Sequence, residues 1–177
     1  MHGTVFSSST SLANIGVRME NILEILEKNS RESSTQIANK LGISAKQVEK
    51  AIKKAEEDRA ILKYTAIVDW SKLGKEKIWA LIEVRITPQQ DIGFDAVAAR
   101  IYGFPQVFSA YLVSGTYDLA IIVRGRSMQD ISSFVTTKLA PIEEVQSTVT
   151  HFLLRRYKDS GEILEATEQV KRLPITL

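Results

Sequence analysis

The chain has no cysteine and only two histidines among its 177 residues, and these scarcities narrow the chemistry open to it. Without cysteine it has neither disulfides nor thiolate metal sites, which is typical of a cytoplasmic protein. His2 and His151 lie far apart in the sequence and offer neither the spacing of a metal site nor a Ser/His/Asp set. We therefore expect no catalytic residue, no metal ligand and no cofactor.

The chain also lacks a long apolar run and an excess of charge of one sign. No run approaches the roughly 20 apolar residues that a membrane span requires, so we expect a cytoplasmic protein without a membrane segment. The 23 basic and 21 acidic residues give a net charge of only +2, which argues against a protein that coats nucleic acid non-specifically. The length leaves room for one small and one medium domain.

The most informative pattern present is a helix-turn-helix between Thr35 and Lys54. Gly42 can end a first short helix in a positive-φ conformation, and Ser44 is a good N-cap for the next one. In that second helix the apolar residues fall on one arc and the lysines gather on the other. Four lysines and one glutamate between Ser44 and Lys54 give a local charge of +3. This pattern predicts a recognition helix for duplex DNA, with an ordinary solvated helix face as the alternative. The candidate DNA-binding residues are Thr35, Ser44, Lys46, Gln47, Lys50, Lys53 and Lys54.

The segments on either side complete a small domain and a connection. Apolar residues between Ile22 and Leu26 predict a first helix, so that residues 19–59 form a three-helix DNA-binding domain. Residues 1–18 are rich in serine and threonine, and we interpret them as an extension or a cloning remnant that precedes the natural start at Met19. Residues 60–70 are β-prone and predict a hinge strand.

Residues 71–177 change to a different periodicity. Apolar residues alternate from Ile78 to Ile86, which predicts a strand with one wholly apolar face. A helix follows at 93–102, then strands at 106–113 and 117–124 joined by a hairpin turn, a helix at 128–139 and a strand at 145–157. The order βαββαβ is that of a ferredoxin-like domain. The predicted fold class is α+β, with an N-terminal helix-turn-helix domain, a hinge strand and a C-terminal ferredoxin-like domain.

Four motifs carry a resemblance to a known family: Leu41-Gly42-Ile43-Ser44 at the helix turn, Ile61 followed by Tyr64-Thr65-Ala66, the segment Leu112-Val113-Ser114-Gly115-Thr116-Tyr117-Asp118, and Thr148-x-Thr150. In these motifs the chain resembles the Lrp/AsnC (leucine-responsive, or feast/famine) transcription regulators from about Met19 onward. The resemblance implies a winged-helix-like DNA-binding domain, homodimers built through the βαββαβ domain and often assembled into octamers, and small effectors, usually amino acids, bound between dimers. The chain departs from the family where it has Arg59-Ala60, since relatives usually have glycine before the hinge.

The turn around Gly115 is the candidate effector site. A glycine turn lets a ligand carboxylate approach backbone N–H groups, while Asp118 can pair with an ammonium group, and an amino acid needs both. The alternative is that Gly115 supplies a positive φ and Asp118 satisfies amides of the turn. The candidate effector-binding residues are Ser114, Gly115, Thr116, Tyr117, Asp118, Thr148 and Thr150.

The sequence therefore predicts a sequence-specific transcriptional regulator whose partners are double-stranded DNA, an amino-acid effector and further copies of the chain. Two alternatives remain open. One is an architectural DNA-binding protein without an effector. The other is an enzyme, a tetrapyrrole decarboxylase of similar architecture, for which this chain offers only His151 with Arg155 and Arg156 nearby.

Overall fold

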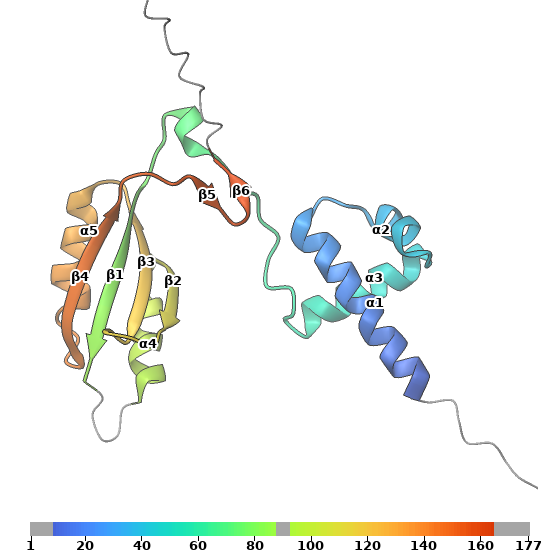
Figure 1. Ribbon diagram of the computed structural model, residues 1–177, viewed down its shortest axis with the longest axis horizontal. Helices are drawn as coiled ribbons and strands as arrows, with labels where there is room; N and C mark the ends of the chain where they lie inside the picture. Colours follow the sequence, from blue (N-terminus) through green and yellow to red (C-terminus); the bar gives the residue numbers. More distant parts are fainter. Residues whose placement is uncertain (1–8, 88–92, 165–177) are drawn as a thin grey trace, which may run out of the picture. The chain divides into compact units, whose positions relative to one another are not determined.

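The computed structural model describes residues 9–87 and 93–164, with side chains from residue 19 onward. The chain divides into two compact units, residues 1–66 and residues 67–177, and each is described by itself (Figure 1). The first unit contains only helices, and the second contains two antiparallel sheets with helices.

The first unit is a three-helix bundle made of α1 (Ser9–Lys28), α2 (Ser34–Leu41) and α3 (Ala45–Glu57). Its core is closed by apolar side chains from all three helices, namely Ile22, Leu26, Ile37, Ala38 and Val48. Helix α1 begins ten residues before the predicted start, so residues 9–18 of the predicted extension are helical. A helix that is already nucleated gains one hydrogen bond for each residue added, which favours such an extension.

The turn between α2 and α3 has the geometry that the sequence predicts. Gly42 ends α2 with φ of +64°, and its N–H donates to the Ala38 carbonyl. Ser44 caps α3, and Gln47 completes a capping box with it. An equivalent box, made by Ser33 and Gln36, starts α2. In each short helix the capping box thus satisfies the N–H groups of the N-cap residue and of the third helical residue, which helps to fix the direction in which the helix begins.

The predicted hinge strand is wrong for the described chain, because residues 61–69 form no strand. A strand is defined by backbone pairing with a neighbour, and β-prone side chains alone do not supply one. The segment instead lies partly on the first unit, where Ile61 N–H donates to the Ala55 carbonyl and Tyr64 Oη donates to Glu56 (2.9 Å). A single 3₁₀ turn, η1 (Trp70–Leu73), follows, with Asp69 as its cap.

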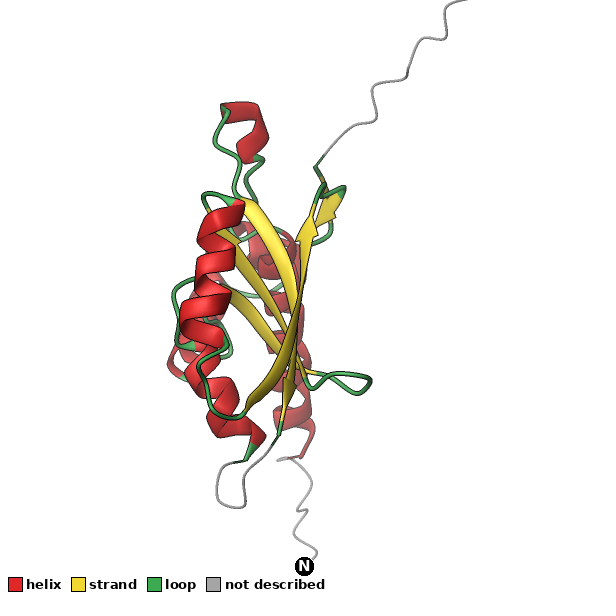
Figure 2. Ribbon diagram, turned by 90° about the vertical axis from the view of Figure 1, so that its left-hand side faces the viewer, coloured by secondary structure: helices red, strands yellow, loops and turns green. Residues whose placement is uncertain are grey.

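The second unit has the predicted βαββαβ order. Its elements are β1 (Ile78–Ile86), α4 (Phe94–Tyr102), β2 (Val107–Leu112), β3 (Leu119–Gly125), α5 (Met128–Phe134) and β4 (Val145–Leu153). The four strands form an antiparallel sheet in the order β2-β3-β1-β4. The helices α4 and α5 pack against one face of the sheet, and Figure 2 shows helices along one side of the strands. Ala80, Ile82, Val84 and Ile86 of β1 are buried beneath them, as their alternation predicts.

Two segments of the second unit differ from the expectation. The helix predicted to end near Leu139 does so, but its last turn, η2 (Val135–Leu139), is π-helical. Hydroxyls of Thr136 and Thr137 donate to carbonyls of the preceding turn there, and such bonds compete with the regular helical pattern. Strand β4 ends at Leu153, four residues early, and a small hairpin of β5 (Lys158–Asp159) and β6 (Glu162–Ile163) follows it.

The face of the sheet opposite α4 and α5 carries large apolar side chains. Phe108 and Tyr111 of β2 and Val149 of β4 are each at least half exposed. Trp79 of β1 lies edge-on against Phe108, with ring centroids 5.0 Å apart. No helix of the described part of the second unit packs on this face, so we refer to it below as the open sheet face.

Candidate DNA interface and effector site

Helix α3 separates its apolar and basic residues as the spacing predicts. Val48 and Ala55 are buried in the helical bundle. The other side of the helix carries exposed residues, namely Lys46, Gln47, Lys50, Lys53 and Lys54. The only ion pair that α3 forms among the described residues is the exposed one between Lys53 and Glu57, with Nζ and Oε1 3.8 Å apart. This exposed side of α3, which we call the lysine face, can therefore offer its cations to phosphate groups.

Two of the predicted DNA-binding residues have structural tasks. Ser44 Oγ accepts the Gln47 N–H (3.3 Å), while the Gln47 Oε1 accepts the Ser44 N–H (3.0 Å). These bonds use Ser44 Oγ and Gln47 Oε1 as acceptors for the first N–H groups of α3. The amide NH₂ of Gln47 has no partner among the described residues. Thr35 is exposed in the first turn of α2. A contact between any of these residues and DNA stays a prediction.

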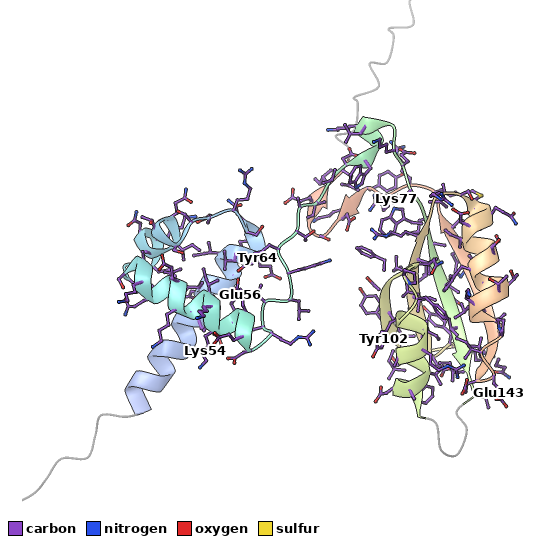
Figure 3. All side chains as sticks on the ribbon, turned by 180° about the vertical axis from the view of Figure 1, so that it is seen from behind. Lys54, Glu56, Tyr64, Lys77, Tyr102 and Glu143 are labelled. Carbon is purple, nitrogen blue, oxygen red and sulfur yellow. The ribbon has the colours of Figure 1, made fainter. Side chains whose placement is uncertain are left out.

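The end of α3 shows why the chain can do without glycine before the hinge. The helix ends at Glu57, and Arg59 adopts φ of +57°, the left-handed conformation that a glycine would take there. The chain then passes over the outside of α3, where Tyr64 reaches Glu56 (Figure 3). Burial, and then the hydrogen bond with the Glu56 carboxylate, raises the pKa of Tyr64 above its usual value.

The predicted effector segment forms the exposed connection between β2 and β3. Ser114, Gly115 and Thr116 are exposed, and Tyr117 and Asp118 are half-buried. Gly115 has φ of +153°, a conformation that other residues rarely adopt. The connection spans residues 113–118 and is longer than the predicted three-residue hairpin turn. The glycine is thus needed by the backbone, in agreement with the structural alternative for this position.

Asp118 is held by the backbone of β1. Its Oδ2 accepts the N–H of Ile86 (2.7 Å), and its own N–H donates to the Val84 carbonyl (3.0 Å). Arg85 donates from its guanidinium to the Thr116 carbonyl, which ties the exposed turn to the same strand. Asp118 therefore has a structural role, while its Oδ1 accepts no hydrogen bond from the described residues.

The two predicted threonines lie on the strand that flanks β1 on its other side. Thr148 pairs with Val84 and Thr150 pairs with Ile82 in the sheet register. Because Val84 also pairs with Leu119, the residue after Asp118, β1 lies between the effector turn and the threonines. The structure brings Asp118 and Thr148 to the same end of the sheet, and Thr150 lies two pairs further along.

Sequence reasoning missed Arg85 as part of this site. The available signal was a cation near the end of a largely apolar strand, which requires a polar partner or solvent. It also missed a group of basic residues at the opposite end of the sheet, which is described below. Among the described residues no group of three His, Cys, Asp or Glu side chains could hold a metal ion. No helix in the described part of the chain is long and apolar enough to cross a membrane.

Two family models match the chain. One, described as "Winged helix-turn-helix DNA-binding", matches residues 19–61, and the other, "Lrp/AsnC ligand binding domain", matches residues 79–163. An uncharacterized HTH-type transcriptional regulator of Bacillus subtilis, YugG, is 44% identical over 88% of this chain and 94% of its own length.

Solved structures show the same fold. Escherichia coli AsnC superimposes with a TM-score of 0.64 at 23% identity, covering 84% of this chain and 97% of AsnC. The Neisseria meningitidis regulator NMB0573, solved as a complex with L-Met, gives a TM-score of 0.65 at 22% identity, covering 80% and 91% of the two chains. With the bundle, the ferredoxin-like unit and the extent of the match to the Bacillus relative, these findings place the chain in the Lrp/AsnC family of helix-turn-helix transcriptional regulators.

Proposed function

We propose that this family member is a sequence-specific regulator that binds its operators through α3 and responds to a free amino acid. The observation that carries the proposal is the lysine face. Four lysines of one short helix are exposed there, and the turn before the helix is fixed by Gly42 and a capping box. Helices presented in this way enter the major groove, where side chains near the helix start reach base edges and lysines reach phosphates.

A homodimer would present two such helices to the DNA. One three-helix module makes few phosphate contacts and binds weakly, whereas two linked modules turn the second contact into an intramolecular event. The open sheet face supports this assembly, since it exposes Phe108, Tyr111 and Val149, and an exposed apolar patch can be buried against the same patch of a second copy across a two-fold axis. Dimers of this kind, acting in the cytoplasm, could assemble further to the octamer that the family resemblance implies.

The effector proposal rests on the turn at residues 114–118. Asp118 keeps one carboxylate oxygen without a partner among the described residues, and the exposed backbone around Gly115 can approach a carboxylate. The L-Met in the Neisseria structure makes methionine the first amino acid to test. An architectural protein without an effector is the alternative that this test excludes or supports.

The DNA proposal is tested by selecting bound sequences from a random duplex pool, with and without an amino-acid mixture. On the selected operator, Lys50→Ala should weaken binding and reduce the slope of log Kobs against log salt by about 0.9 for each phosphate that the variant no longer neutralises. Lys28→Ala is the matched control, because Lys28 is an exposed lysine of the same unit at the end of α1. Equal affinity and slope for the Lys50 variant and the wild type would overturn the assignment of α3.

The effector proposal is tested by thermal unfolding with each of the twenty amino acids at millimolar concentration. An effector present at a hundredfold excess over its Kd stabilises the protein by about 2.7 kcal/mol. Asp118→Asn should abolish that shift, while an asparagine oxygen can still accept the Ile86 N–H and preserve the fold. If no amino acid changes melting, assembly or operator affinity, the turn is only a structural connection.

A further inference from the structure

A hollow of about 440 Å³ lies where β3 ends and α5 begins, on the second unit. Lys77 contributes to it from the residue before β1, and Arg124 from the end of β3. Arg126 comes from the turn before α5, and Lys138 from the π-helical turn. We call these four residues, Lys77, Arg124, Arg126 and Lys138, the basic hollow. Two of them also contact aromatic rings, since the Arg124 guanidinium lies over Phe108 (5.3 Å to the centroid) and Lys77 Nζ over Trp70 (5.9 Å). Arg126 and Lys138 have no such ring contact among the described residues, so they are the cations most available to a ligand.

The cations of the hollow are only weakly neutralised. Asp130 is the one carboxylate in its lining, and hydrogen bonds from the backbone N–H and then the guanidinium of Arg126 hold its pKa below the usual value. The Arg126–Asp130 pair is 3.4 Å long with the arginine side chain 94% exposed, so it contributes little to stability. Lys138 forms no ion pair with any described residue. The hollow therefore keeps a net positive charge.

The positive charge of the hollow is local, because the unit as a whole has no net charge. Residues 67–177 contain thirteen basic and thirteen acidic residues, so the unit as a whole is neutral. The other end of the sheet carries Asp118, Glu143 and Glu144 together with two cations, Arg85 and Arg100, which bind the Thr116 carbonyl and Glu144. Figure 3 shows Lys77 and Glu143 near opposite ends of the unit.

The basic surface continues beyond the hollow. A second, smaller hollow of about 150 Å³ shares Lys77 and Arg124 with the first and adds Arg155 and Arg156 beyond β4, together with the carboxylates Asp69 and Glu76. Arg156 is partly used by the fold, because it lies over the Trp79 ring (4.7 Å to the centroid) and pairs with Asp159 (2.7 Å). The cations thus extend over two neighbouring hollows, and the first of these has the larger excess of positive charge.

We propose that the basic hollow is a second contact site for DNA phosphates, which holds the duplex beside the segment read by α3. The proposal rests on the proposed DNA-binding function. Exposed cations such as Arg126 and Lys138, spread over an open surface, suit a phosphate backbone that stays in water, whereas a small-molecule site encloses most of its ligand. The end of the sheet that carries the hollow is also where the chain arrives from the DNA-binding unit, since η1 ends only four residues before Lys77. The segment that follows the DNA-binding unit along the chain therefore leads directly to this end.

The test compares two double variants of the full chain on two selected duplexes. Arg126→Gln with Lys138→Gln removes both charges, and Arg126→Lys with Lys138→Arg keeps them. Both residues are exposed, and thermal unfolding verifies that each variant is folded. One duplex ends at the selected operator, and the other extends beyond it by about one helical turn on each side.

On the longer duplex, the neutral variant should lose about 1.8 from the salt slope per chain if each side chain contacts one phosphate. The decrease in affinity between 50 mM and 200 mM salt should then be about tenfold smaller than for the wild type. The charge-keeping variant should match the wild type, and the short duplex should show no difference. An unchanged slope on the longer duplex would overturn the inference.

Two further outcomes distinguish this inference from the proposed function and from binding of a small phosphorylated ligand. If Lys50→Ala weakens binding but the neutral hollow variant does not, the inference fails while the proposed function stands. If Lys50→Ala also has no effect, the proposed function itself fails. Tripolyphosphate serves as a probe without DNA. Stabilisation by tripolyphosphate that the neutral variant loses, with an unchanged slope on the longer duplex, would overturn the DNA contact in favour of a small phosphorylated ligand.

Discussion

Arg59 occupies a backbone conformation that costs an L residue about 1 kcal/mol relative to glycine. Arg59 lies just beyond the C-cap residue Asp58 of α3, and its φ of +57° turns the chain away from the helix axis. We predict that Arg59→Gly raises the free energy of unfolding by up to about 1 kcal/mol, because relief of strain exceeds the extra entropy of glycine in the unfolded chain.

Urea unfolding of the full chain measures this effect. Arg59→Ala is the control, since it removes the same charge but keeps the Cβ atom that causes the strain. An Arg59→Gly variant no more stable than Arg59→Ala would show that the left-handed residue carries no strain.

The pair formed by Glu144 and Arg100 is the one buried carboxylate contact in the described chain. The Glu144 side chain is only 2% exposed, and both its oxygens lie within 3.1 Å of Arg100 Nη1. We predict that Arg100→Ala lowers the free energy of unfolding by about 2 kcal/mol, because it leaves a buried carboxylate without its partner.

Glu144→Gln should cost less than Arg100→Ala, since an amide oxygen can still accept from Arg100 and no uncompensated charge remains. Arg126→Ala provides the surface control, because its partner Asp130 lies in an exposed pair and the variant should unfold like the wild type. Equal decreases for the Arg100 and Arg126 variants, read from urea unfolding, would contradict the importance of burial.

At the scale of elements, the N-cap of α3 decides how firmly the lysine face is presented. Ser44 forms both bonds of its capping box with Gln47. We predict that Ser44→Ala lowers the free energy of unfolding by about 1 kcal/mol, whereas Ser44→Asp retains the stability because aspartate caps as well as serine. Chemical unfolding of the full chain distinguishes these outcomes, and an Ala variant as stable as the wild type would exclude an energetic role for the cap.

The elements also show which features follow from local sequence. The three helices of the first unit and the alternation in β1 were predictable, since each depends on residues a few positions apart. The hinge strand was predicted wrongly because pairing depends on a second segment, which β-propensity does not reveal. Within the candidate effector site, the sequence predicted the turn at Gly115 but not the bond from Ile86 to Asp118, whose partners lie 32 residues apart.

At the scale of the whole molecule, the open sheet face should control assembly. Val149 and Leu153 of β4 are 50% and 39% exposed on that face. We predict that Val149→Lys with Leu153→Lys yields monomers in light scattering and weakens operator binding, because burying two unpaired ammonium groups in an interface is unfavourable. Met128→Lys, at an equally exposed apolar position on α5, should leave assembly unchanged. Dimers of the double variant would show that another surface joins the chains.

The Tyr64–Glu56 hydrogen bond has a consequence for operator geometry. Tyr64 is held on α3, and Asp69 is fixed in the cap of η1. Residues 65–68 alone connect these two fixed points, and four residues span at most about 14 Å. Without that bond the free segment becomes residues 62–68, with a reach of about 24 Å. The Tyr64 hydroxyl thus sets the length of the connecting segment. When its hydrogen bond to Glu56 breaks, a dimer should tolerate a wider range of separations between the two DNA half-sites.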